Sequence, residues 1–118
     1  MGLVTLLTYR TFHLTLRPVY RYGFCVIKSF VDKRTAAIFA GYIVRDLPLQ
    51  IQKRARAKLI AIDAAKRLDD LRIPPGNRLQ TLHSCREGQH SIRINDQWRI
   101  CFVWRDGESW DVEIVDYH

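Results

Sequence analysis

The sequence predicts one α+β domain in which helices pack on one face of a twisted antiparallel sheet. Residues 32–71 carry apolar side chains at helical spacing, and the IPPGN stretch at 73–77 ends this helical half. After it come four short runs of β-type residues, separated by links of hairpin length. Because helices and then strands follow one another in blocks, we expect a helix layer and a sheet layer.

Two helices preceded by one strand are expected in the first half. The run VIKSF at 26–30 is of β type, and Asp32 is a suitable N-cap for a short helix that ends near Gly41. Asp46 is predicted to cap a second helix that continues to Leu71. The first half therefore reads as strand, helix, helix.

The second helix is predicted to be amphipathic with a basic back. Its expected core face carries Ile51, Ala55, Leu59 and Ile62. Lys53, Arg56 and Arg67 fall roughly opposite. Such a back is either a solvated charged face or a surface for phosphate or an acidic partner, and Lys53 and Arg56 are our RNA-binding candidates on it.

Four strands are predicted after the break, at 78–82, 89–94, 98–104 and 110–117. Alternation puts Arg99 on the sheet face away from the helices, beside Arg93 of the preceding strand. Guanidinium groups bind phosphate oxygens in bidentate fashion, so these two arginines are candidate phosphate ligands. The side chains predicted to face the core from the third strand are Trp98, Ile100, Phe102 and Trp104.

Composition points to one domain with a polyanionic partner. The 118 residues are 47% hydrophobic and carry 19 Lys and Arg against 12 Asp and Glu, a formal charge of +7. Nucleic acid is the commonest such partner, although an acidic protein would also fit. The first acidic residue is Asp32. We therefore interpret residues 1–25 as an N-terminal extension and 26–118 as the domain.

No metal, cofactor or membrane partner is expected. Cys25, Cys85 and Cys101 stand far apart without metal-ligand spacing, which fits a reducing cytoplasm. No apolar stretch approaches the roughly 20 residues of a membrane helix. Without a metal or cofactor, the reaction that best fits the candidate residues is attack of an RNA 2′-hydroxyl on the adjacent phosphate, with arginine stabilising the negative charge.

Titratable side chains at the end of the last strand could move the protons. Asp116, Tyr117 and His118 combine an acid, a phenol that can stack on a base, and an imidazole that titrates near neutrality. Gln80 and His83, on the first strand after the break, could meet them if the outer strands curl together.

Four stretches of the chain resemble the HigB branch of the RelE/ParE toxin superfamily. They are VIKSFVDKRTAAIFAG, the segment around QKRARAKL, GQHSIRINDQWRICFVW and VEIVDYH. The resemblance extends from about Val26 to His118. It implies a RelE-like fold and a type II toxin, a ribosome-dependent endoribonuclease that enters the A site and cuts translated mRNA. It also implies a HigA-like helix-turn-helix antitoxin, whose complex with the toxin would bind operator DNA.

The resemblance also assigns roles to individual residues. His118 would donate or accept a proton, Tyr117 would stack on a nucleotide, Asp116 would orient a neighbour, and Arg99 would hold the scissile phosphate. Where the family usually has Leu-Lys-Gly-Asp-Arg, this chain reads Leu82-His83-Ser84-Cys85-Arg86. His83 thus stands where a lysine is expected, and Gln80 takes a position that often carries His or Glu. Arg86 joins the RNA-binding candidates.

Two alternatives to the nuclease stay open. One is a non-catalytic inhibitor like the ParE side of the superfamily, and the other is a degenerate toxin that acts only by binding its antitoxin. Tyr117 and His118 favour the nuclease, because a pure binder needs no titrating group there. The change at His83, Ser84 and Cys85 favours the degenerate toxin.

Overall fold

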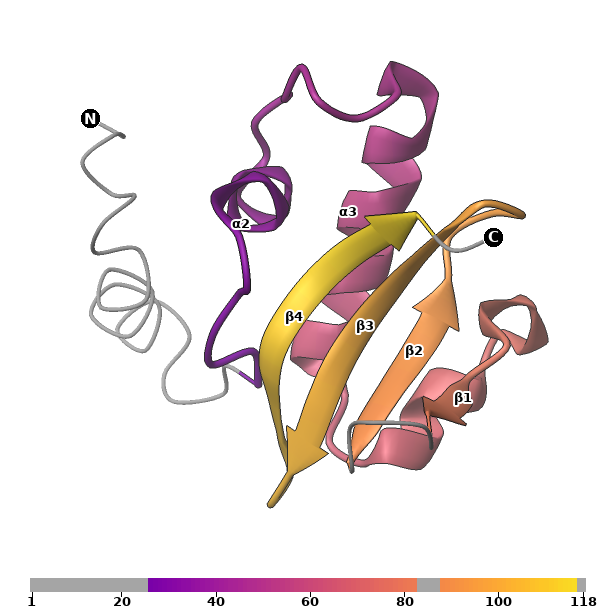
Figure 1. The fold of residues 1–118 in the computed structure, drawn as a ribbon. Coiled ribbons are helices and arrows are strands. Elements are labelled where there is room, and N and C mark those ends of the chain that lie inside the picture. The colour runs from indigo at the N-terminus through magenta and orange to yellow at the C-terminus, as the bar shows by residue number, and fades with distance from the viewer. Residues whose placement is uncertain (1–25, 83–87, 117–118) are drawn as a thin grey trace.

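A helix layer covers one face of a four-stranded antiparallel sheet in the computed structural model, which describes residues 26–82 and 88–116 (Figure 1). The sheet order is β1-β2-β3-β4, so the strands follow one another as hairpins. This arrangement confirms the predicted α+β fold. The elements are α2 (Lys33–Ala40), α3 (Leu49–Ala64), the 3₁₀ turns η2 (Leu68–Arg72) and η3 (Pro75–Asn77), β1 (Gln80–Leu82), β2 (Gln89–Arg93), β3 (Trp98–Arg105) and β4 (Glu108–Asp116).

Both ends of α2 lie where the sequence predicts them. The Asp32 side chain accepts a hydrogen bond of 2.9 Å from the Thr35 backbone N–H, and this satisfies one of the free donors of the first turn. Gly41 ends the helix with φ of 101°, a left-handed conformation that favours glycine.

Both predicted ends of the second helix were wrong. Asp46 does not cap α3, which begins after Pro48 without a side-chain cap. An N-cap side chain reaches the N–H two or three residues on, and Pro48, two residues after Asp46, has none. The helix also ends at Ala64 rather than Leu71.

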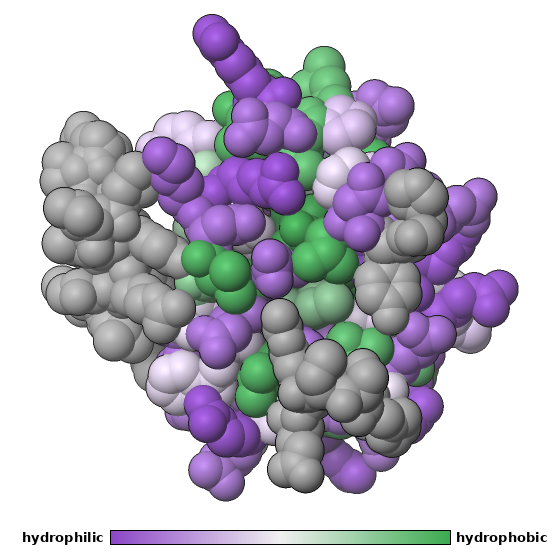
Figure 2. Space-filling view, viewed as in Figure 1, coloured by the Kyte–Doolittle hydropathy of each residue, from purple (hydrophilic) through white to green (hydrophobic). Residues whose placement is uncertain are grey.

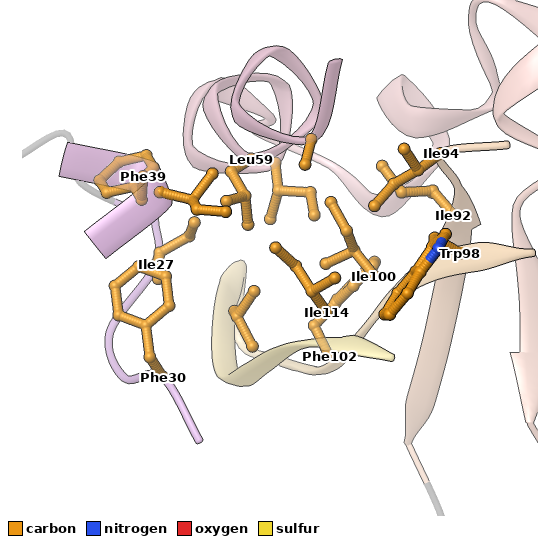
Figure 3. Close-up of a cluster of buried hydrophobic side chains, with 14 of the residues drawn as sticks. Ile27, Phe30, Phe39, Leu59, Ile92, Ile94, Trp98, Ile100, Phe102 and Ile114 are labelled. Carbon is orange, nitrogen blue, oxygen red and sulfur yellow. The ribbon is translucent and has the colours of Figure 1, made fainter. Parts of the chain in front are cut away.

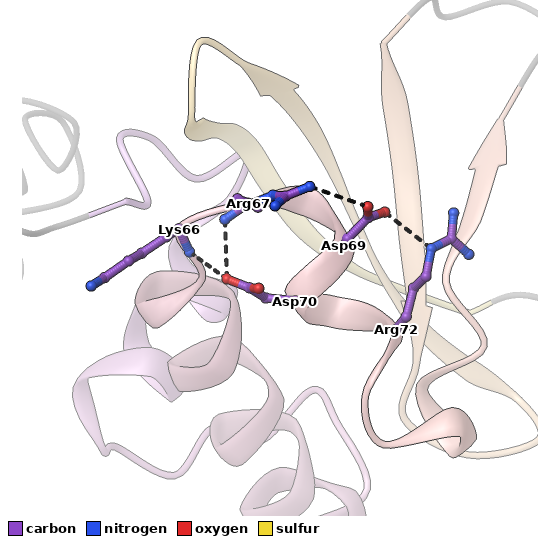
Figure 4. A network of polar contacts seen from close by, with 5 residues as sticks. All are labelled: Lys66, Arg67, Asp69, Asp70 and Arg72. Carbon is purple, nitrogen blue, oxygen red and sulfur yellow. Dashed lines mark hydrogen bonds and ion pairs between the residues drawn. The ribbon is translucent and has the colours of Figure 1, made fainter.

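Asp70 provides the reason for the early end of α3. Its carboxylate accepts hydrogen bonds from the backbone N–H groups of Lys66 (2.9 Å) and Arg67 (3.1 Å), donors that a longer helix would use internally (Figure 4). These bonds lower the pKa of Asp70. Arg67 consequently precedes η2 instead of belonging to the basic face of α3, and it pairs with Asp69 at the surface.

The core lies between the helices and the sheet. All four residues of the predicted α3 core face are buried, and the aromatic face of β3 points at them. Trp104, the last of that face, is partly buried against the cluster. The side chains labelled in Figure 3 come from the segment before α2, from both helices and from β2, β3 and β4.

The predicted strand at 26–30 is present as two isolated parallel bridges to β4. Lys28 N–H donates to the Ser109 carbonyl (2.7 Å), and Val31 N–H donates to the Val112 carbonyl (3.0 Å). The ladder is interrupted because β4 bulges at Asp111, which has φ of 52°.

Two side chains secure this segment. The Ser29 hydroxyl accepts the Asp111 N–H (2.9 Å) and donates to the Asp111 carboxylate (3.2 Å). On the other side, the buried Asp63 carboxylate of α3 accepts the backbone N–H groups of Val26 (3.1 Å) and Ile27 (3.0 Å). The segment thus joins the helix layer to the last strand of the sheet.

We expect Asp63→Ala to destabilise the domain by about 2 kcal/mol or more, because the buried Ile27 N–H and the partly buried Val26 N–H lose their acceptor. Asp63→Asn should cost less, since its amide oxygen can still accept. Equilibrium urea unfolding measures both changes. The exposed Asp69→Ala is the control and should stay within about 0.5 kcal/mol of the parent. Equal effects at the two positions would contradict the anchoring role of Asp63.

Candidate functional site

The sheet face away from the helices carries three of the predicted site residues, namely Gln80, Arg93 and Arg99. Cross-strand pairing places Gln80 of β1, Ser91 of β2, Cys101 of β3 and Glu113 of β4 in one row across this face. Arg99 lies in the adjacent row. Figure 1 views this side with α3 behind the sheet, and Figure 2 shows hydrophobic residues near its centre with hydrophilic ones around them.

Arg99 is held rigidly within this face. Its side chain is only 7% exposed. The Nε donates to the Ser91 hydroxyl (2.8 Å), and Nη2 donates to the Arg78 carbonyl (2.6 Å) and the Ser91 carbonyl (3.3 Å). The planar cation is therefore fixed in orientation by two elements of the fold, as preorganised electrostatic stabilisation requires.

Arg93 is the cross-strand partner of Arg99, as expected from the alternation. It is more exposed, and its guanidinium pairs with Asp96 in the β2–β3 turn. Asn95 orders that turn, since its side-chain oxygen accepts the N–H groups of Gln97 and Trp98, each at 2.8 Å. Two cations opposite one another disfavour the sheet slightly and attract anions to it.

The other predicted catalytic residues divide into two groups. Gln80 is exposed on β1, directly opposite Ser91. Asp116 ends β4 and accepts a 3.1 Å hydrogen bond from the Gln97 amide. It pairs with Trp98, so its register position is on the helix side, the opposite side from Arg99. His83, Arg86, Tyr117 and His118 lie outside the described residues.

Lys53 and Arg56 lie far from the two strand arginines. Both are exposed on α3, on the side of the helix that faces away from the sheet. The structure therefore brings Arg93, Arg99 and Gln80 together on one face and puts Lys53 and Arg56 on the other side of the domain.

Sequence reasoning missed two residues of the open face, Ser91 as a partner of Arg99 and Glu113 as a carboxylate diagonal to it. Alternation along β2 puts Ser91 on the same face as Arg93, but it does not reveal the hydrogen bond of Ser91 to Arg99. Alternation along 112–116 would have found Glu113, because Val112 and Ile114 are buried and Glu113 points the other way.

Across residues 26–82 and 88–116, no group of three or more His, Cys, Asp or Glu could hold a metal ion. In the same residues, no helix is long and apolar enough to cross a membrane. Cys101 is buried on the open side of the sheet, outside the main hydrophobic cluster.

Two helices followed by a four-stranded antiparallel sheet, in a small basic chain, are consistent with a RelE-like toxin, and comparison with known proteins supports this class. The model of the RelE-like toxin of type II toxin-antitoxin system HigB matches residues 28–118. The chain therefore belongs to this family of type II toxins, whose members act with an antitoxin partner.

Curated relatives are consistent with this family. The chain is 46% identical to Toxin HigB-1 of Vibrio cholerae over 63 residues, and this alignment covers 53% of this chain and 66% of the relative. It is 33% identical over 97 residues to Endoribonuclease HigB of Proteus vulgaris, which covers 79% of this chain and 100% of the relative. An uncharacterised Haemophilus influenzae protein is 34% identical over 62 residues, 52% of this chain and 61% of that protein.

His90, on the helix side of β2, should make the stability of the domain depend on pH because its imidazole is buried. Burial lowers its pKa, so the unfolded chain binds this proton at a higher pH than the folded chain does. Stability from His90 is complete above its ordinary pKa of about 6.5 and is lost as the pH falls through the lowered value. When the pH is lowered from 7.5 to 5.5, we expect the Tm of His90→Gln to fall less than the Tm of the parent. Equal losses would show that another group is responsible.

Removing either strand arginine changes the charge equally but should affect stability differently. We expect Arg99→Ala to cost about 1 to 3 kcal/mol, because Arg99 is buried and its hydrogen bonds hold Ser91 and Arg78. Arg93→Ala should cost less than about 1 kcal/mol, since its ion pair with Asp96 is largely exposed. Urea unfolding of both variants measures the difference. Equal costs would mean that Arg99 is not structurally fixed.

Proposed function

We propose that this chain is a ribosome-dependent endoribonuclease that cleaves mRNA as the toxin of a type II toxin–antitoxin system. The observation that supports this most is the fixed Arg99 guanidinium on the open sheet face of a HigB-family domain. The relative named Endoribonuclease HigB, aligned over its whole length, supports the same activity.

The proposed reaction needs no metal. The 2′-oxygen of a ribose attacks the adjacent phosphorus while the bond from phosphorus to the 5′-oxygen breaks, which leaves a cyclic phosphate and a 5′-hydroxyl. Arg99 would stabilise the charge on the phosphate oxygens as that charge increases. His118 would take or supply a proton, Tyr117 would stack on a base, and Asp116 would orient a neighbour.

The remaining candidates would complete the RNA site. Arg93 and Arg86 would contact the RNA backbone, and Gln80, which lies opposite Ser91, would donate to a phosphate or base. His83 would move a proton at the position where the family resemblance implies a lysine. In this proposal the chain acts in the cytoplasm at the ribosomal A site, and a HigA-like antitoxin restrains it and binds operator DNA with it.

The alternative that a specific observation favours is a toxin without cleavage activity. His83, Ser84 and Cys85 replace the usual Lys-Gly-Asp, and histidine is a poorer permanent cation than lysine. Such a chain would act only through antitoxin binding, or would inhibit a target as a ParE-like binder.

Primer extension on a translated mRNA, with and without ribosomes, tests the proposal. We expect cleavage only with ribosomes, and His118→Ala should reduce it by about 100-fold or more, the range for loss of a general acid or base. Arg67→Ala, an exposed residue before η2 that is not part of the proposed site, is the control and should cleave like the parent. Growth arrest without any cleavage would support the non-catalytic alternative, and cleavage of naked mRNA would overturn ribosome dependence.

A further inference from the structure

An apolar groove lies between the end of α2 and the first turns of α3, on the side of the domain away from the sheet. Its volume is about 320 Å³. Three large apolar side chains that border it stay open to solvent, namely Tyr42 (70% exposed), Ile43 (76%) and Leu49 (65%). Clustered exposed apolar side chains of this kind commonly mark an interaction site.

The link that presents these side chains is fixed by Gln52. This buried residue of α3 accepts the Val44 N–H (3.0 Å) and donates to the carbonyls of Val44 and Leu47, each at 2.8 Å. Tyr42 and Ile43 are therefore displayed by an ordered loop. Because little ordering remains to be done, binding at this surface would cost little conformational entropy.

The charge at the groove indicates the class of partner. Among the described residues that line it, the charged ones are Lys53 and Arg56, which are both cations. Arg56 is held in place, since its Nε donates to the Phe39 carbonyl at 3.3 Å. An apolar surface with a cationic rim is complementary to an amphipathic segment that carries acidic side chains.

We propose that this α2–α3 groove binds an acidic amphipathic segment of the antitoxin. The inference rests on the antitoxin partner in the proposed function and adds where that partner docks. RNA fits less well, because the centre of the groove is apolar and the strand arginines lie on the other side of the sheet. A second copy of this chain fits less well too, because the chain has a formal charge of +7 and the cationic rims would repel.

Binding of the purified antitoxin, measured by isothermal titration calorimetry, tests this inference. We expect Ile43→Asp to weaken antitoxin binding about tenfold or more, because it puts a charged carboxylate where the apolar part of the groove would contact the antitoxin. Ile73→Asp is a closely matched control, since Ile73 is 77% exposed on a different part of the surface. It should bind like the parent. Unchanged binding by Ile43→Asp, with correct folding, would overturn the proposal.

A charge-reversal pair tests the rim separately. Lys53→Glu should weaken antitoxin binding several-fold, whereas Lys66→Glu, exposed beyond the end of α3, should not. If Lys53→Glu instead lowers mRNA cleavage and leaves antitoxin binding intact, the groove belongs to the RNA surface. If Ile43→Asp converts a dimer of the toxin alone into a monomer, a second copy occupies the groove. Either result overturns the proposal.

Growth assays separate this inference from the proposed nuclease. Cells that express Ile43→Asp should arrest even when the antitoxin is co-expressed, whereas the antitoxin should rescue Ile73→Asp. The calorimetry does not depend on cleavage, so a toxin without nuclease activity would still report on the groove. Loss of rescue without loss of cleavage would leave both conclusions standing.

Discussion

The Asp63 carboxylate connects the two layers of the domain, and the sheet geometry depends on that connection. It binds the backbone of Val26 and Ile27, and the segment that follows runs parallel to β4. Without this segment β4 would be an unprotected edge with free backbone groups. Ser29 then holds the bulge at Asp111, which sets the register in which β4 presents Glu113 beside β3. A helix residue thus influences the site on the opposite face of the sheet.

The same rigidity defines the candidate active site. Arg99 is fixed by the Ser91 hydroxyl and by the Arg78 carbonyl, at a residue with left-handed backbone just before β1. A guanidinium on a flexible surface would lose entropy when it orders around a phosphate. Arg99 is already ordered, so in the proposed function its structural role and its role at the phosphate would coincide in one side chain. The helix side has a different character, because its exposed residues near α2 and α3 form an apolar groove with a cationic rim.

The sequence predicted the elements whose local signals agree, and it failed where local signals compete or where groups far apart in the chain decide. The two ends of α2 were predicted from Asp32 and Gly41, because the hydrogen-bond partners of these residues lie within a few positions in the sequence. The short links between the strands predicted that neighbouring strands pair as hairpins. The end of α3 could not be predicted, because Asp70 takes the N–H groups of Lys66 and Arg67 from the helix. Alternation gave the face of Arg99 but not its burial, which depends on Ser91 and on Arg78. Tyr117 and His118 stay predictions.

Because Arg93 is paired with Asp96, binding of an RNA phosphate by Arg93, as proposed, would exchange one ion pair for another. Asp96 is 96% exposed, so water readily solvates its carboxylate once a phosphate displaces it from Arg93. The net gain in binding free energy would then be the difference between the Arg93–phosphate pair and the Arg93–Asp96 pair. This difference is smaller than the free energy that an unpaired arginine would gain from the same phosphate. If Arg93 binds RNA as proposed, Asp96 in the turn between β2 and β3 would act as a weak internal competitor for phosphate, which would weaken the binding of a polyanion and speed its dissociation.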